Sequence, residues 1–500
     1  MDLAKHRIKD DGYLVLLIAV FSLPVYFFDV SNSTILGIYL VLLAFISISI
    51  FPRFKAWWFP GIIGLIILLP GPLDRMYYSV QLSPEPDTPA YGVISVIDIL
   101  MFATLVVKLW EKRRLKNLFN AEINYLTLAL IAITFLGMIS SLQSYFNYPL
   151  FHFPMAVRAI FYSVRFLLVF SWISNYFNDI STFKKFPVAI YLITLAFFFL
   201  VLLSPKENYE GGNRLSVATY GVNTFGHLLA FTSLLCIPFI SYYYKLKKSG
   251  VLLGLTACFL ICLLFLLLSA NRMSFVLLLL GILFYNLLMP VAFAKKIRLI
   301  FLFIIVLATV IFLFFLFKPD LLSRVFGVFE LISGKNAIEN IGELQARFVV
   351  WNISWEMITT HPLLGAGPGQ WNYLKHEFGS IPPWMTTILD PHNGYLLYAS
   401  EMGLICTFIY YSIIIACIRK GYRAFKQLKK VYLADQSRDT WFYMSAILML
   451  SIIIVCWLLA DLTNASGLNI RVQSLMWSLA GISFISPSLV KKYIKANHES

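Results

Sequence analysis

HPLLGAGPGQW, residues 361–371, interrupts the hydrophobic pattern that fills most of this chain. Its glycines and prolines cannot continue a helix, and glycines such as Gly365 and Gly367 can hold backbone conformations that other residues avoid. The stretch therefore predicts a shaped turn. On its N-terminal side, RFVVWNISWEMI (347–358) has an aromatic-rich face at helical spacing. This pattern predicts an amphipathic helix that lies flat on a membrane and starts at Arg347.

The C-terminal side of the same interval ends in DPHNG, residues 390–394. An apolar run from 395 to 418 follows directly, so His392 is expected at the mouth of a membrane helix. A titratable side chain would then stand where lipid meets water. Everything outside the interval 347–404 reads as membrane span or short connector.

Composition excludes a soluble domain. Hydrophobic residues make up 59% of the 500 residues and charged residues only 13%, which predicts an all-α polytopic membrane protein. The formal charge of +15 would suggest nucleic acid in a soluble protein, but here most lysines and arginines lie in short links between apolar runs. They orient the chain in the bilayer, and no nucleic-acid partner is expected.

At roughly 20 residues per span, we expect fourteen transmembrane helices. The basic links alternate, so all of them fall on one side, which we take as cytoplasmic together with both termini. Residues 1–317 would form an N-terminal bundle of about eleven helices, 318–393 one long extracytoplasmic loop, and 394–500 about three further helices and a tail. The expected spans are 12–30, 33–51, 57–71, 91–109, 122–142, 159–177, 186–204, 222–244, 251–269, 273–294, 299–317, 394–418, 440–460 and 471–489.

Arginines dominate the cations of the predicted outer face. Their planar fork suits bidentate contact with phosphate oxygens, which points to a diphosphate ligand near the lipid surface. Pairing with lipid headgroups or with local acids is the alternative for any single arginine. Arg158 and Arg165 share one helix face, about 10 Å apart, which would put Arg165 inside the membrane. The expected diphosphate-binding residues are Arg158, Arg165, Arg214, Arg272 and Arg347.

His392 is the candidate general base, because a histidine near neutral pKa can take the proton of an attacking hydroxyl. The alternative is a histidine that caps a helix or packs a loop. Asp390 could orient the ring, and Asn393 follows it directly. Glu401 is expected to neutralise Arg165 or another buried cation rather than to act in catalysis.

Other chemistry lacks a signal in the sequence. The predicted outer segments have no paired carboxylates, no Asp-x-Asp motif and no cluster of metal-ligating residues, so we expect neither a metal nor another cofactor. No phosphate loop or nucleotide fingerprint occurs either, which disfavours ATP-driven transport. All six cysteines fall inside apolar runs, where packing is their expected role.

The order of the pieces in 347–404 resembles the large-loop signature of the O-antigen ligase and polymerase superfamily of membrane glycosyltransferases. These pieces are the arginine, the helix with tryptophans, Pro-Leu-Leu-Gly-x-Gly-x-Gly, His-Asn and Tyr-Leu-x-x-x-x-Glu-x-Gly-Leu. Arg272 in its hairpin also matches a recurrent feature, whereas the spacing after Arg214 is looser than the family's Arg-x-x-x-Asn pattern. The resemblance implies a type-C membrane glycosyltransferase-like bundle whose arginines and histidine meet in one outer cavity.

The leading hypothesis is an inverting, metal-independent glycosyltransferase at the outer side of the bacterial cytoplasmic membrane. Its donor would be a glycan on a polyprenyl diphosphate such as undecaprenyl diphosphate, and its acceptor a saccharide or glycolipid. The number of spans favours a polymerase of repeat units, which leaves room for a chain-length regulator as a partner. The alternatives are a ligase acting on a lipid A core or other surface acceptor, and a flippase for the same lipid-linked glycan.

Overall fold

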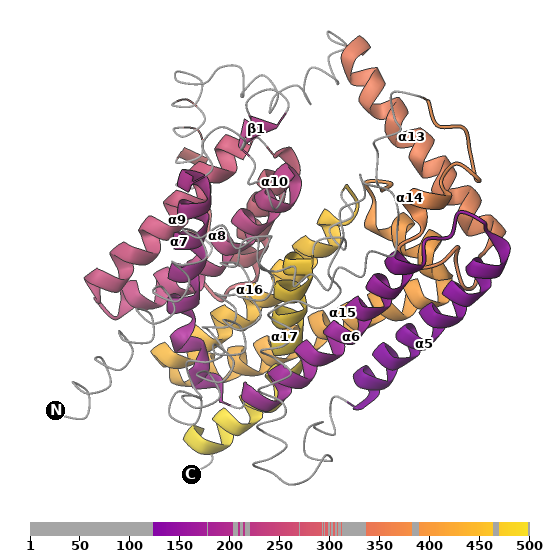
Figure 1. Ribbon diagram of the computed structural model, residues 1–500. Coiled ribbons are helices and arrows are strands. Elements are labelled where there is room, and N and C mark those ends of the chain that lie inside the picture. The colour runs from indigo at the N-terminus through magenta and orange to yellow at the C-terminus, as the bar shows by residue number, and fades with distance from the viewer. Residues whose placement is uncertain are drawn as a thin grey trace, which may run out of the picture.

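The protein is described here from a computed structural model (Figure 1). The described residues are 124–177, 179–203, 209–210, 214–215, 221–269, 271–292, 337–382, 390–463 and 470–498, with a few helical positions between 294 and 312. The four spans expected between 12 and 109 lie outside them, as does most of the span expected at 299–317.

The described part is helical apart from one two-residue strand pair, in which β1 (Tyr209–Glu210) runs antiparallel to β2 (Arg214–Leu215). Five described helices are long and apolar enough to cross a membrane: α5, α8, α9, α15 and α16; α10 is a shorter apolar helix. The helices are α5 (Asn124–Asn147), α6 (Phe153–Tyr176), the 3-10 helix η3 (Ile180–Lys185), α7 (Phe186–Leu203), α8 (Gly221–Lys245), α9 (Ser249–Ser269), α10 (Arg272–Leu288), α13 (Ala337–Thr360), α14 (Trp371–Leu374), α15 (Gly394–Asp435), α16 (Arg438–Ala460) and α17 (Ile470–His498).

Two helix boundaries differ most from expectation. Helix α13 starts at Ala337, so Arg347 lies in its middle and does not begin it; the preceding residues include alanine, glutamate, leucine and glutamine, which are good helix formers. Helix α15 continues past the expected end at residue 418 to Asp435. Lysine and arginine also favour helix, and the helix ends only where Gln436 adopts a left-handed conformation with φ 49°.

Hydrogen bonds join several links that were predicted to be extracytoplasmic. At the starts of α8 and α10, Asn271 Nδ2 donates to the backbone and side-chain oxygens of Asn223, at 3.2 and 3.1 Å. At the start of α15, the Gly394 N–H donates to the Asp461 carbonyl beyond α16, at 2.6 Å. These contacts gather helix ends from distant parts of the chain at one end of the bundle.

The opposite ends of the same helices meet through a second set of contacts. Lys184 Nζ lies 2.7 Å from Asp439 Oδ2, and the Tyr242 hydroxyl donates to Asp439 Oδ1 at 2.8 Å. Lys245 Nζ lies 3.6 Å from the ring centre of Trp441. All of these residues fall in or beside links that were predicted to be cytoplasmic.

The core runs through the middle of the bundle, where α8 packs on α9 and α16, and α15 packs on α16 and α17. Trp457 and Trp477 are fully buried there. The six cysteines are free thiols and all are buried, which agrees with a packing role.

Candidate functional site

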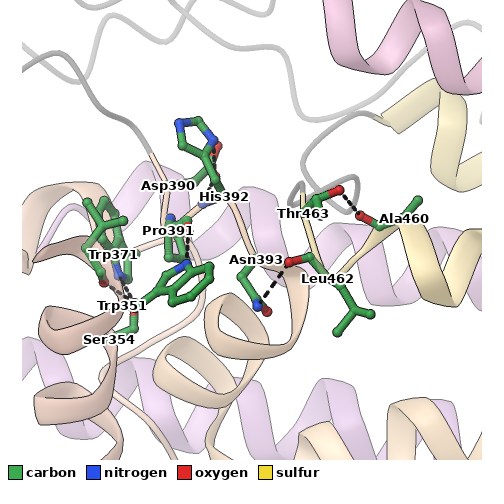
Figure 2. Close-up of polar contacts among 11 residues, drawn as sticks. Trp351, Ser354, Trp371, Asp390, Pro391, His392, Asn393, Ala460, Leu462 and Thr463 are labelled. Atoms are coloured by element: carbon green, nitrogen blue, oxygen red, sulfur yellow. Dashed lines mark hydrogen bonds and ion pairs between the residues drawn. The ribbon is translucent and has the colours of Figure 1, made fainter. Parts of the chain in front are cut away.

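His392 stands in a strained turn at the start of α15. Its φ is 50°, a left-handed value that is uncommon for a residue with a side chain. Asp390 holds this conformation, because its Oδ1 accepts the His392 backbone N–H at 2.6 Å and lies 3.3 Å from His392 Nδ1 (Figure 2). The Asp390 side chain is mostly buried, at 15% exposed, while the histidine side chain is 40% exposed. The ring is thus oriented by a carboxylate and remains accessible.

Neighbouring elements are hydrogen-bonded to both sides of this turn (Figure 2). Trp351 of α13 donates its indole N–H to the Pro391 carbonyl at 3.0 Å. Asn393 caps α15, since its Oδ1 accepts the Leu396 N–H at 3.1 Å, and its Nδ2 donates to the Leu462 carbonyl at 3.3 Å. The turn therefore depends on α13 from the loop and on the end of α16.

Asp461, at the end of α16, supports the turn most closely. Besides the bond from the Gly394 N–H to its carbonyl, its side chain leaves no room for a larger residue at 394, because a Cβ there would lie 2.9 Å from Asp461 Cγ. The side chain is fully buried, and the Tyr411 hydroxyl donates to its Oδ2 at 3.4 Å. Asp461 was not among the candidate site residues expected from the sequence; the available signal was a carboxylate beside the end of a membrane helix.

The glycine turn packs against a break in α15. Gly403 has φ 75° and ψ 169°, so the helical hydrogen-bond pattern is interrupted there. The turn replaces the missing bonds: Ala366 N–H donates to the Ser400 carbonyl at 2.8 Å, Gly367 N–H donates to the Glu401 carbonyl at 3.0 Å, and Leu404 N–H donates to the Pro362 carbonyl at 2.9 Å. The shaped turn expected from the sequence is therefore present as part of a turn-and-helix unit.

Positive φ values explain two of its glycines. Gly365 has φ 74° and lies against the Glu401 carbonyl, and Gly367 has φ 104°. A side chain at either position would be strained, and at 365 it would also collide with backbone.

Glu401 anchors the same turn through its carboxylate. Oε2 accepts the Gly369 N–H and Oε1 accepts the Trp371 N–H, both at 2.9 Å. The side chain is buried, at 9% exposed. The expected neutralisation of Arg165 or another buried cation by Glu401 stays a prediction, and the backbone partners found here are not apparent from the sequence.

His361 begins the glycine turn and fastens it to α5. Its Nε2 is hydrogen-bonded to the Tyr148 hydroxyl, and its Nδ1 lies 3.4 Å from Gln143 Nε2. Burial lowers the pKa of His361 and, with Glu377 nearby, raises the pKa of Tyr148. These contacts give His361 a structural role in holding the glycine turn.

Arg347 lies on α13 one turn before Trp351, about 6 Å from it along the helix axis. Because Trp351 contacts Pro391, the half-buried Arg347 comes from the same segment that supports the His392 turn. One expected phosphate-binding arginine therefore lies on the helix that contacts the His392 turn.

The other expected arginines lie on elements around the bundle. Arg165 of α6 is 4% exposed, next to Phe166, whose ring stacks on Trp477 of α17 at 4.7 Å. For the remaining three the backbone is described: Arg158 is near the start of α6, Arg214 begins β2 and Arg272 is the first residue of α10.

A comparison with known protein families gives a match that covers the His392 turn and the glycine turn. A family model described as O-Antigen ligase matches residues 257–411, which include α10, the glycine turn, the His392 turn and the break in α15. No match was found among curated proteins. Within the described residues, no group of three or more histidine, cysteine or acidic side chains is arranged to hold a metal ion.

Proposed function

We propose that this protein is an inverting, metal-independent glycosyltransferase; the match of residues 257–411 to a family model described as O-Antigen ligase supports this proposal. Its donor is a glycan on a polyprenyl diphosphate, and its acceptor is a hydroxyl of a saccharide or glycolipid. Transfer takes place on the outer side of the bacterial cytoplasmic membrane. The observation that carries the proposal is the accessible, carboxylate-oriented His392 in its strained turn.

His392 acts as the general base in this proposal. Asp390 engages Nδ1, which leaves Nε2 to take the proton of the acceptor hydroxyl. The acceptor oxygen bonds to the anomeric carbon as the bond from that carbon to the diphosphate breaks. The leaving diphosphate keeps the electron pair, and the anomeric configuration inverts.

Arginines stabilise the leaving group. A diphosphate leaving group is stabilised by positive charge and does not need a proton from a general acid. Guanidinium groups supply that positive charge. Arg347 is supported by its place on α13, one turn from the Trp351 contact, and Arg165 by its burial in α6. The other expected members of the set are Arg158, Arg214 and Arg272.

Polymerisation of repeat units is the preferred form of the reaction, because the roughly fourteen spans expected from the sequence exceed what is typical of a ligase. A ligase would transfer the finished glycan once to a lipid A core or other surface acceptor. Incubation with lipid-linked repeat unit alone separates them: a polymerase gives a ladder of products, whereas a ligase gives none until its acceptor is added.

Replacing His392 tests the enzyme hypothesis directly. Removal of the base in His392→Ala should lower kcat by about 10²–10⁴-fold, the usual contribution of general base catalysis. The matched control is His376→Ala, because His376 is an exposed histidine of the same loop. Turnover of purified protein with lipid-linked glycan is the measurement. Full turnover by His392→Ala would contradict the base role of His392. Absence of glycosyl transfer by the wild-type protein would instead favour the flippase alternative.

A further inference from the structure

Among the residues that the structure describes, His227 is a buried histidine without a hydrogen-bond partner. It lies in α8 and is 1% exposed, yet neither Nδ1 nor Nε2 has a partner among the described residues. Ser274 Oγ on α10 is likewise buried and unpartnered in the described part of the chain. Buried polar atoms without partners cost stability, so their presence calls for a functional reason.

The direction of His227 follows from the faces of α8. Helix α8 meets α10 at Gly226, where an added Cβ would lie 2.8 Å from Ser274 Oγ. It meets α16 through Phe239 and Tyr242, whose rings lie 5.3 and 4.4 Å from that of Phe442. At about 100° of rotation per residue, His227 falls between these two faces.

The third side of this junction is closed by α16 against α10. Cys456 Sγ of α16 contacts the Leu277 carbonyl of α10 at 3.5 Å, near the end of α16 that supports the His392 turn. The junction also lies under the hairpin that carries Arg272, since Asn223 and Asn271 are bonded one turn above His227 and Ser274. The junction of α8, α10 and α16 thus lies between the His392 turn and the hairpin that carries Arg272.

The chemistry of the free atoms points to a hydroxylated ligand. A neutral imidazole offers one donor and one acceptor, and a serine hydroxyl offers both. Sugar hydroxyl groups match this combination, whereas phosphate oxygens only accept hydrogen bonds and are served by the arginines. Among the described helices that could span a membrane, α8 and α16 are the most enclosed: 78% and 83% of the residues in their most apolar segments are buried. An isoprenoid chain belongs on the lipid side, so the glycan is the part of the donor that suits this interior junction.

We infer that His227 and Ser274 form a saccharide-binding subsite for the donor glycan at the junction of α8, α10 and α16. This inference rests on the proposed function. Entry of a sugar ring requires the outer ends of α8 and α10 to separate, which the Asn271 contact with Asn223 opposes in this structure.

Two lipid probes test the subsite on the purified full-length protein: undecaprenyl diphosphate carrying the repeat unit, and undecaprenyl diphosphate alone. His227→Leu should weaken binding of the glycan-bearing lipid at least tenfold and leave binding of the bare diphosphate within twofold. Its melting temperature without ligand should stay equal or rise, because the leucine removes two desolvated nitrogens. His227→Gln keeps a donor and an acceptor and should lose less affinity.

Ser274→Ala provides a second variant and should show the same glycan-selective loss. Ser233→Ala is the matched control in α8, since the Ser233 hydroxyl is buried but bonded to the Leu229 carbonyl at 2.8 Å; both affinities should remain within twofold.

Three results would overturn the subsite: unchanged glycan binding in both His227→Leu and Ser274→Ala, equal weakening of both lipids, or a melting temperature lowered by several degrees in His227→Leu with no selective loss in Ser274→Ala. Failure of the wild-type protein to bind either lipid would instead overturn the proposed function, and the subsite with it.

Discussion

Single residues of the candidate site are held by backbone contacts more than by side-chain pairs. His392 keeps a left-handed φ because Asp390, Trp351 and Asp461 fix the turn around it. Strain of this kind costs about 1–3 kcal/mol and persists only where the surroundings determine the conformation. The strained backbone lies at a partly exposed histidine, which agrees with a functional site.

The His361 contact predicts a pH dependence of stability. Burial lowers the pKa of His361 in the folded state, so the unfolded state takes up the proton first as the pH falls below about 6.5. The free energy of unfolding should therefore decrease as the pH falls through this window and recover above it. The slope from one group cannot exceed about 1.4 kcal/mol per pH unit, and partial exposure keeps it lower.

Melting of the purified protein between pH 7.5 and 5 measures this effect. His361→Gln should flatten the acid side of the curve, whereas His376→Gln, at an exposed histidine, should leave the curve unchanged. Identical curves for the wild type and His361→Gln would show that another group controls stability in this range.

At the scale of the element, the break in α15 and the glycine turn form one unit. The helix lacks regular hydrogen bonds around Gly403, and the turn supplies replacements from Ala366 and Gly367. Glu401 adds two hydrogen bonds from backbone N–H groups of the turn to its carboxyl oxygens. Neither piece is complete without the other.

Gly403→Ala should therefore disrupt this unit. Its φ of 75° is unfavourable for alanine, and the new methyl group would collide with the Leu363 carbonyl. We expect a loss of at least about 2 kcal/mol, seen as a lower melting temperature and reduced turnover.

Gly250→Ala is the control for Gly403→Ala. Gly250 lies at the start of α9, and an added Cβ there meets nothing within 4 Å. This variant should match the wild type or be slightly more stable. Equal stability of Gly403→Ala and Gly250→Ala would contradict the prediction that the break in α15 requires glycine at position 403.

For the whole molecule, the two ends of the bundle are distinct. The described links predicted to face outward meet around the His392 turn and the Arg272 hairpin, and those predicted to face the cytoplasm meet around Asp439. Figure 1 shows α14 and the base of α13 beside the start of α15, away from the C-terminus. The assignment of these two ends to the outer and cytoplasmic faces of the membrane stays a prediction.

Accessibility of introduced cysteines tests which end faces outward. A membrane-impermeant maleimide should label His376→Cys in intact cells, whereas Lys430→Cys should react only after permeabilisation; both positions are exposed. The native cysteines are buried and should give little background. Labelling of Lys430→Cys in intact cells with protection of His376→Cys would reverse the orientation.

The sequence alone determined the class of the protein, the approximate positions of its described spans and the turn-forming character of 361–371. These follow from local composition and periodicity, which need no knowledge of distant contacts. It also singled out His392 and Arg347, because a histidine and an arginine beside apolar helices are unusual wherever the chain folds.

Only the tertiary structure decided which groups meet. Residues 367 and 401, or 394 and 461, are far apart in the sequence, and no local pattern encodes their hydrogen bonds. The break in α15 and the partners of Glu401 were invisible for the same reason. In the sequence, His227 looked like an ordinary residue at the start of a span. That its nitrogens are buried and have no partner in the described part of the chain became apparent only from the packing of α8, α10 and α16, since burial is a property of the assembled helices.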